Sequence, residues 1–410
     1  VEVPSQVVTV AGQSRLQVLA SNIPAAGYRV FEIVPGAGQS WTAAATVTNG
    51  NIIDTTQYRL TFSDRGAITS WIDKTRNNIE LVQASNGFYL NDLGAGTGTI
   101  QVEQTGPVSV TLLATTTTPV AHTTRLTVLR DSPRVTIENR ITQSFADVQS
   151  WRFSFNAATP TIRHEEVGAI LKVGLTSQGG NYATRNARYD WLTLNHFVDV
   201  TAANNIGVTL SNMDLYFMQV GNSTTTTLDA GSPLIKVLAG GQIDGPNLGM
   251  QNQGGDTSFL QRFALRSHDA FDAPSAMSFA MEHQNPLVAR TLVPGGTAYP
   301  ATTYSLISVP TDAGTLLWTL KPAEDGIDQG VVIRLWNLRP TSVTPTIRLA
   351  DGGIRAASRL SHVETFEETA TVQSGGLIAQ LAGNQMRTYV VQPAPGGTPP
   401  APPTNVRIVR

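Results

Sequence analysis

The sequence contains no cysteine, and this absence excludes several kinds of chemistry. Without thiols the chain has no disulfide framework, no cysteine-ligated zinc site and no thiol nucleophile. Charged side chains are also scarce, at 14% of the 410 residues, against about 25% in an average globular protein. The net charge of −2 gives no electrostatic reason to expect a nucleic acid or an anionic membrane as a partner.

Long hydrophobic runs are missing as well. No apolar stretch approaches the roughly 20 residues that cross a bilayer, so we expect no membrane partner. The N-terminal residues VEVPSQVVTV have neither the basic nor the apolar region of a signal peptide. We expect them to come from the interior of a longer protein. Hydrophobic residues still make up 41% of the chain, enough for a buried core. The abundance of Thr, Ser, Asn, Gln and Gly is typical of extracellular β-proteins, and we expect a bacterial, secreted protein.

Alternating apolar and polar residues, the pattern of half-buried strands, recur along the chain. Residues 58–62 alternate, the turn Asp64-Arg65-Gly66 follows, and residues 67–72 return, which predicts a β-hairpin that ends in Asp73-Lys74. A second hairpin is predicted over residues 125–141, and further strands over 108–112, 151–155, 331–338 and 386–391. No long stretch shows an apolar period of 3.6 residues. The predicted fold class is therefore all-β.

Glycine- and proline-rich segments interrupt the strands and suggest domain limits. Long connections are expected at residues 177–181, 240–255 and 294–300. At residue 393 the chain changes to PAPGGTPPAPP, a semi-rigid linker, and TNVRIVR after it resembles the first strand of another module. We predict a small β-domain end over 1–46, a large sandwich over 47–295, a C-terminal sandwich over 296–392, and a linker with the start of a further module over 393–410.

Several stretches, taken in order, resemble the C-terminal β-region of glycoside hydrolase family 38, the α-mannosidases. The hairpin over 58–74 is one, and four others agree: ASNIPAAGYRVFEI (20–33), YDWLTLNHFVDVTAANNIGVTLSN (189–212), LLWTLKPAEDGIDQGVVIRLWN (316–337) and SHVETFEE (361–368), where Ser361-His362 replaces the family's first residues. Each segment alone is only a strand with turn residues. Their shared order extends over roughly residues 1–392.

The resemblance implies tandem β-sandwiches that include a large galactose-mutarotase-like supersandwich. In the family, catalysis belongs to an N-terminal α/β barrel that carries a zinc ion, an aspartate nucleophile and an acid/base carboxylate, the pair that retaining hydrolysis requires. This sequence has no positions that match the barrel. The resemblance therefore implies no catalytic residue, no metal and no cofactor in this chain, with zinc expected only in the barrel. The implied partners are that barrel and a mannose-containing glycan.

A cluster of aromatic and polar residues is the best candidate for a carbohydrate site. Asp190, Trp191 and His196 combine a ring that stacks on a pyranose with groups that bind hydroxyls. The competing interpretation makes Trp191 and Phe197 core residues and places Asp190 and Asp199 in turns.

Two further clusters contain residue types that carry chemistry. His164 and Glu166 share one face of a predicted strand, but zinc needs a third ligand that the sequence does not supply. His268, Asp269 and Asp272 resemble a base with its orienting partner, but no nucleophile motif accompanies them. Neither cluster is predicted to be catalytic.

Three functions remain open on the sequence alone. The first is a β-sandwich scaffold of an α-mannosidase-like hydrolase that also shapes its sugar subsites. The second is a freestanding carbohydrate-binding module, and the third is a lyase or epimerase on a supersandwich, because one sandwich fold hosts many functions.

Overall fold

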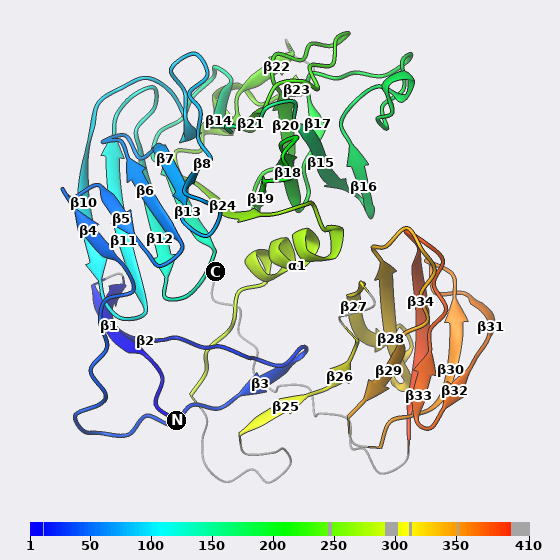
Figure 1. Ribbon diagram of the computed structural model, residues 1–410. Coiled ribbons are helices and arrows are strands. Elements are labelled where there is room, and N and C mark those ends of the chain that lie inside the picture. Colours follow the sequence, from blue (N-terminus) through cyan, green and yellow to red (C-terminus); the bar gives the residue numbers. More distant parts are fainter. Residues whose placement is uncertain (11, 245–247, 292–301, 311–313, 351, 395–410) are drawn as a thin grey trace. The chain divides into compact units, whose positions relative to one another are not determined.

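The computed structural model describes residues 1–10, 12–244, 248–291, 302–310, 314–350 and 352–394. Strands dominate these residues, and the prediction of an all-β fold with tandem sandwiches is confirmed (Figure 1). The chain divides into two compact units, one made of Val1–Leu19 and Ala37–Leu287, the other of Ala20–Gly36 and Val288–Arg410. The domain limits given from the sequence stay predictions. The connection at 294–300 and the tail beyond residue 394 lie outside the described residues.

The first unit contains a large sandwich of two antiparallel sheets, whose strands differ in length. The nine-stranded sheet has the order β10 (Gly98–Thr105), β11 (Ser109–Thr116), β12 (His122–Leu129), β13 (Val135–Ile141), β24 (Phe259–His268), β19 (Gly207–Asn212), β18 (Phe197–Thr201), β15 (Thr161–Glu166) and β16 (Ala169–Lys172). The ten-stranded sheet has the order β17 (Leu192–Thr193), β20 (Phe217–Val220), β21 (Leu234–Gly240), β14 (Gln149–Ser154), β9 (Leu90–Asp92), β7 (Ile68–Asp73), β6 (Tyr58–Phe62), β5 (Ile52–Asp54) and β4 (Thr46–Thr48), with β8 (Ile79–Glu80) paired to β7.

Side chains from both sheets form one continuous core, as the alternation in the sequence requires. Tyr58, Leu60 and Phe62 of β6 all point into it, and Leu126 and Val128 of β12 do the same from the other sheet. Both predicted hairpins are present, as β6–β7 and β12–β13. A one-residue slip in either would turn these apolar side chains toward solvent, so burial fixes the register.

One helix, α1 (Ala273–Gln284), follows β24 and packs against β18 and β19 (Figure 1). The sequence reading did not anticipate it. Its buried face, made of Ala276, Met277, Phe279, Ala280 and His283, has the spacing of a helix. Most of these side chains are small or polar, so a search for apolar periodicity passes over them.

The first unit is completed by short elements. These are the hairpin β1 (Ser5–Val10) and β2 (Gln13–Val18), the pair β22 (Gln242–Asp244) and β23 (Leu248–Gly249), and the 3-10 turns η1 (Thr176–Gln178) and η2 (Gln251–Gly255). The expected connections at 177–181 and 240–255 therefore contain short ordered elements in their described parts.

The second unit has its own sandwich and its own core. One sheet has the order β27 (Thr315–Ala323), β28 (Gly326–Asn337), β34 (Met386–Pro393), β30 (Ile354–Leu360) and β31 (Phe366–Ala370); the other has β26 (Ile307–Ser308), β29 (Thr346–Leu349), β33 (Gly376–Ile378) and β32 (Val372–Gln373). β3 (Gly27–Arg29) pairs with β25 (Thr303–Ser305).

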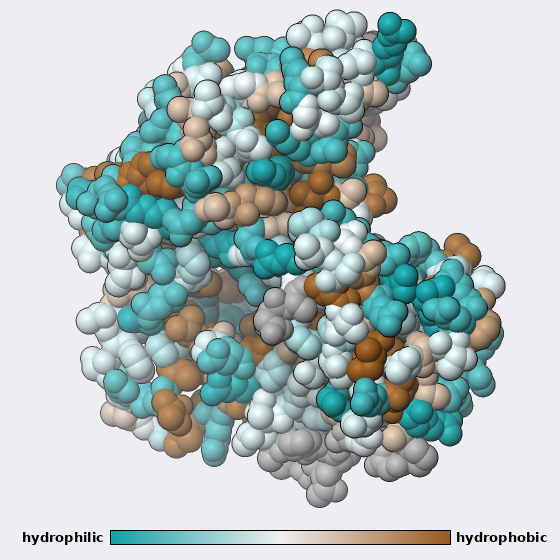
Figure 2. All heavy atoms as spheres, turned by 45° about the vertical axis from the view of Figure 1, so that its right-hand side comes forward, coloured by the Kyte–Doolittle hydropathy of each residue, from teal (hydrophilic) through white to brown (hydrophobic). Residues whose placement is uncertain are grey.

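On the face that Figure 2 shows, hydrophilic and near-neutral residues predominate, and strongly hydrophobic residues form small separate groups. Among the residues that the structure describes, no helix has the length and apolar character needed to cross a membrane.

Candidate functional site

The three residues predicted to bind carbohydrate lie just before β17 and β18. Asp190 is only 8% exposed, and its carboxylate pairs with Arg188 at 2.7 and 2.8 Å. The hydrogen bonds from Arg188 hold the pKa of Asp190 below its usual range. Trp191 is half-buried, and the ring of His196 lies 2.6 Å, through Nδ1, from Glu165 Oε2. Both polar side chains thus have partners within the protein, and their role toward a sugar stays a prediction.

The residues His164, Glu165 and Glu166 lie on β15, where His164 and Glu165 are fully buried. His164 Nε2 lies 2.7 Å from the Tyr182 hydroxyl, and the two rings stack. Burial lowers the pKa of His164 to about 4, so this imidazole is neutral at pH 7. Within the described ranges, no group of three or more His, Asp or Glu side chains is arranged to hold a metal ion.

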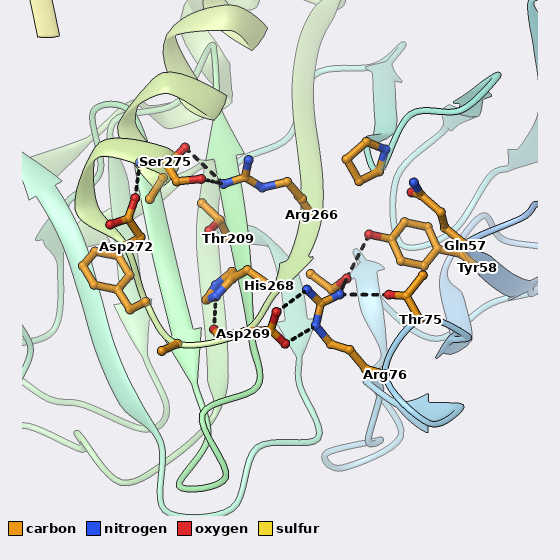
Figure 3. A pocket seen from close by; sticks show the side chains of 15 residues that line it. Gln57, Tyr58, Thr75, Arg76, Thr209, Arg266, His268, Asp269, Asp272 and Ser275 are labelled. Carbon is orange, nitrogen blue, oxygen red and sulfur yellow. Dashed lines mark hydrogen bonds and ion pairs between the residues drawn. The ribbon is translucent and has the colours of Figure 1, made fainter. Parts of the chain in front are cut away.

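A cavity of about 420 Å³ opens between the β6–β7 hairpin and the segment that joins β24 to α1 (Figure 3). The hairpin supplies Tyr58 and Arg76, and the joining segment supplies His268, Asp269 and Asp272. This size lies in the lower part of the range of about 300 to 1,000 Å³ for small-molecule sites. Since the lining mixes charged, amide, hydroxyl and aromatic groups, it suits a polar ligand the size of a monosaccharide.

A chain of hydrogen bonds joins the hairpin to β24 at the wall of this cavity. Tyr58 donates its hydroxyl to Ser267 Oγ at 2.9 Å, and Ser267 donates to Asp73 Oδ2 at 2.6 Å. Arg76 donates from Nη1 to Asp73 at 2.8 Å. Its Nε and Nη2 donate to Asp269 at 2.8 and 3.2 Å (Figure 3). Asp73, at the end of the hairpin, is thus a buried carboxylate that links the two sheets.

Burial alone would favour the neutral form of Asp73, since a carboxylate loses its hydration there. Hydrogen bonds from Ser267, Thr75 and Arg76 outweigh that effect and lower the pKa of Asp73. Burial also raises the pKa of the Tyr58 hydroxyl, so the phenol stays protonated and acts as a donor. The network is thus a fixed charged wall rather than a proton-transfer site.

His268 forms its acid–histidine pair with a residue that the sequence reading placed in a turn. Its Nε2 lies 2.6 Å from Asp199 Oδ2, a fully buried carboxylate in β18 that also accepts from Thr201 and Thr209. Its Nδ1 lies 2.6 Å from the carbonyl oxygen of Asp269. Both ring nitrogens are therefore engaged, and in this arrangement the imidazole has no nitrogen left to accept a proton from a substrate.

Arg266 connects β24 to the beginning of α1. Its Nη2 donates to the carbonyl oxygen and to the hydroxyl of Ser275, both at 3.0 Å, and its guanidinium lies 4.8 Å from the centroid of the Phe279 ring. Asp272 caps the helix by accepting from the Ser275 N–H at 3.0 Å. Sequence reasoning missed this arrangement; the available signal was Asp272 two residues before Pro274, an N-cap followed by an early proline.

The second unit contains a smaller hollow of about 290 Å³ lined by Arg359, His362, Glu367 and Arg387. Arg359 is paired there with Glu367 and Glu368 at 2.8 and 2.6 Å. These carboxylates are substantially exposed, so the pairs are weak and carry no evident chemistry.

Comparison with known proteins reveals a shared fold. No family model and no curated protein matches the sequence. An α-mannosidase from Enterococcus faecalis V583 aligns with a TM-score of 0.62 and 14% identity over 86% of this chain and 43% of its own. A glycosyl hydrolase family 38 protein from Enterococcus faecalis aligns with a TM-score of 0.65 and 13% identity over 96% of this chain and 50% of its own. A galactose mutarotase-like protein from Lactobacillus casei ATCC 334 aligns at a TM-score of 0.34 and 12% identity over 53% of this chain and 98% of its own. This chain thus spans about half the length of the first two proteins, and at these identities the likeness concerns the fold alone.

Proposed function

We propose that this chain is the C-terminal β-sandwich portion of an α-mannosidase-like retaining glycoside hydrolase, and that it scaffolds a catalytic α/β barrel. The observation that carries the proposal is the asymmetric coverage of the structural match. The alignment extends over 86% and 96% of this chain but only 43% and 50% of the two Enterococcus proteins. The order of the family-like segments in the sequence supports the same assignment. In this proposal the protein is bacterial, is secreted and acts outside the cell.

In this proposal the hydrolytic residues and the zinc ion belong to the barrel. The described residues of this chain contain no zinc ligand set, and both nitrogens of His268 are bound. Because both ring nitrogens of His268 are already bound, a lyase or epimerase that uses His268 as its base is disfavoured.

In this proposal the chain itself binds the sugar and does not cleave it. The cavity beside Arg76 and Asp272 offers charged and neutral hydrogen-bonding groups for the hydroxyls of a mannose-containing glycan. Asp190, Trp191 and His196 remain the second proposed contact for carbohydrate. A freestanding carbohydrate-binding module is the alternative function, favoured by the fact that the cavity lies entirely within the first unit.

Hydrolysis of an aryl α-mannoside by this chain alone, with and without zinc, tests the assignment. We expect no turnover by this chain alone, and zinc-dependent turnover by a longer protein that includes both this chain and a catalytic barrel. Turnover by the chain alone would refute the scaffold proposal. Titration of the chain with α-mannobiose, with Asp272→Asn as the variant, then tests the cavity: binding that the variant leaves unchanged would exclude it as the sugar site.

A further inference from the structure

Two positive side chains lie directly opposite each other on the outer face of the ten-stranded sheet. Arg152 of β14 pairs in register with Lys236 of β21, which in turn pairs with Gln219 of β20. Neighbours in β14 such as Trp151 and Phe153 point into the core, so Arg152 points away from it. Like charges at directly opposed positions destabilise a sheet, so this arrangement calls for a physical reason.

The two cations are hydrogen-bonded to neutral oxygens rather than to a carboxylate. Among the described residues, neither Arg152 nor Lys236 has a carboxylate oxygen within 4.0 Å: Arg152 donates to the carbonyl oxygen of Leu93 at 3.1 Å, and Lys236 donates to the amide oxygens of Gln219 and Asn222 at 3.0 and 3.3 Å.

Two nearby acids are committed elsewhere. Asp92, the register neighbour of Arg152, is bound by Arg65 at 2.6 and 3.0 Å. Asp229 accepts from the backbone N–H of Asn222 at 2.8 Å. Burial lowers the pKa of Arg152 against the opposing charge of Asp92, and burial together with the charge of Arg152 lowers that of Lys236 against the opposing charge of Asp229. The two acids therefore do not fully offset the lost hydration of the cations, and a bound anion would offset more of it.

The groups around the pair are those that recognise a sugar. The ring of Phe88 lies against the Arg152 guanidinium, with 3.8 Å from Cζ to the ring centroid, and holds it in place. Phe217 is 48% exposed and shares the outward face of β20 with Gln219, about 7 Å along the strand. The amide of Gln219 positions Lys236, because its oxygen accepts from Lys236 while its Nε2 donates to the carbonyl oxygen of Ser223 at 2.8 Å, and Asn222 adds a second amide oxygen beside Lys236. An exposed ring beside two cations can receive the face and the acid group of one sugar unit.

We propose that Arg152 and Lys236, with Gln219 and Phe217, form a binding site for an acidic saccharide whose carboxylate lies between the two cations. The site is on the outer face of the ten-stranded sheet and does not overlap the cavity beside His268. It goes beyond the proposed function, because mannose is neutral and gives these cations no partner. A protein carboxylate is the competing occupant, but the exposed ring of Phe217 beside the cations favours a sugar, whose face stacks on such a ring.

The test is calorimetric titration of the chain with tri-galacturonic acid, with mannotriose and sodium sulfate as separate arms at matched ionic strength. We expect tri-galacturonic acid to bind, with an affinity that falls as salt rises. The double variant R152Q/K236Q should lose at least tenfold in affinity, and F217A should lose several-fold. R59Q is the matched control, since Arg59 is an exposed residue on the outward face of β6 in the same sheet and should leave binding unchanged.

Several outcomes would overturn the proposal. Equal binding of mannotriose would remove the requirement for an acid group, and equally tight binding of sulfate would remove the requirement for a sugar. Unchanged affinity in R152Q/K236Q, or no binding by the unaltered chain, would exclude the site. If the double variant instead weakens association with a catalytic portion while the acidic sugar does not bind, the pair serves a protein contact. Because R152Q/K236Q removes a repulsion, unfolding should not account for its loss of binding, and circular dichroism checks this.

Discussion

Gly66, in the turn of the β6–β7 hairpin, should tolerate alanine much less well than Gly50, in the turn between β4 and β5. Both glycines have positive φ, +85° and +73°. Alanine at either position therefore carries a backbone cost of about 1 kcal/mol. The two sites differ in the space around them, and that difference gives the prediction its magnitude.

A Cβ at Gly66 would lie 2.7 Å from Thr124 Cβ, 2.9 Å from its Oγ1 and 3.2 Å from Ala114 Cβ, whereas at Gly50 it would meet nothing within 4 Å. Thr124 is buried, and its hydroxyl donates to Asn139 Oδ1 at 2.8 Å, so rotation away from the new methyl group would break that bond. Overpacking of this kind costs about 1 to 3 kcal/mol. We expect G66A to lose about 2 to 4 kcal/mol and G50A about 1 kcal/mol.

The assay should report on the first unit alone, since two units need not unfold together. Hydrogen exchange of peptides from β6, β7 and β12, measured against guanidinium concentration, gives the local free energy of opening. Equal losses in G66A and G50A would refute the argument, because they would show that Thr124 and Ala114 move aside without cost.

Three further predictions concern polar and charged side chains of the first unit. Burial lowers the pKa of His164 and of His283 to about 4. The unfolded chain, with a histidine pKa near 6.5, therefore binds more protons below pH 6.5, and each residue removes up to about 3 kcal/mol of stability as the pH falls toward 4. Urea midpoints at pH 7 and pH 4.5 measure the loss, and a drop that H283N leaves unchanged would contradict the assignment to His283. Arg76→Met leaves the buried carboxylate of Asp73 without its cation and should cost about 3 kcal/mol in thermal or urea unfolding; a loss below about 1 kcal/mol would show that the hydroxyl donors suffice. Asp272→Ala removes the N-cap of α1 and should cost about 1 kcal/mol, seen as faster hydrogen exchange in the helix and not in β6; unchanged exchange would mean that packing alone holds the first turn.

The cavity shows why a site is harder to predict than a strand in this fold. His268 and Asp269 are adjacent in the sequence, yet the partner of the His268 ring is Asp199, 69 positions earlier. Asp269 instead binds Arg76, 193 positions earlier. Strand alternation says which face a residue occupies, but not which distant strand lies beside it. No local pattern in the sequence contains those pairings.

Local patterns determined most of the secondary structure. Because side chains alternate across a strand, the apolar residues 58, 60 and 62 and the turn ending in Gly66 were sufficient to predict the hairpin and its buried face. The low content of charged residues and the absence of long apolar runs likewise limited the class of protein from composition alone.

Tertiary structure decided what lies next to what. The order of strands in the two large sheets brings Asp199 to His268 and places Arg152 opposite Lys236, and no local rule predicts a like-charge pair at such a position. It also forms α1, whose buried side chains are mostly small or polar and become stable only against β18 and β19. The physical reason is the same in each case: strand propensity is a property of a few consecutive residues, whereas sheet order, helix packing and paired charges depend on contacts between segments far apart in the chain.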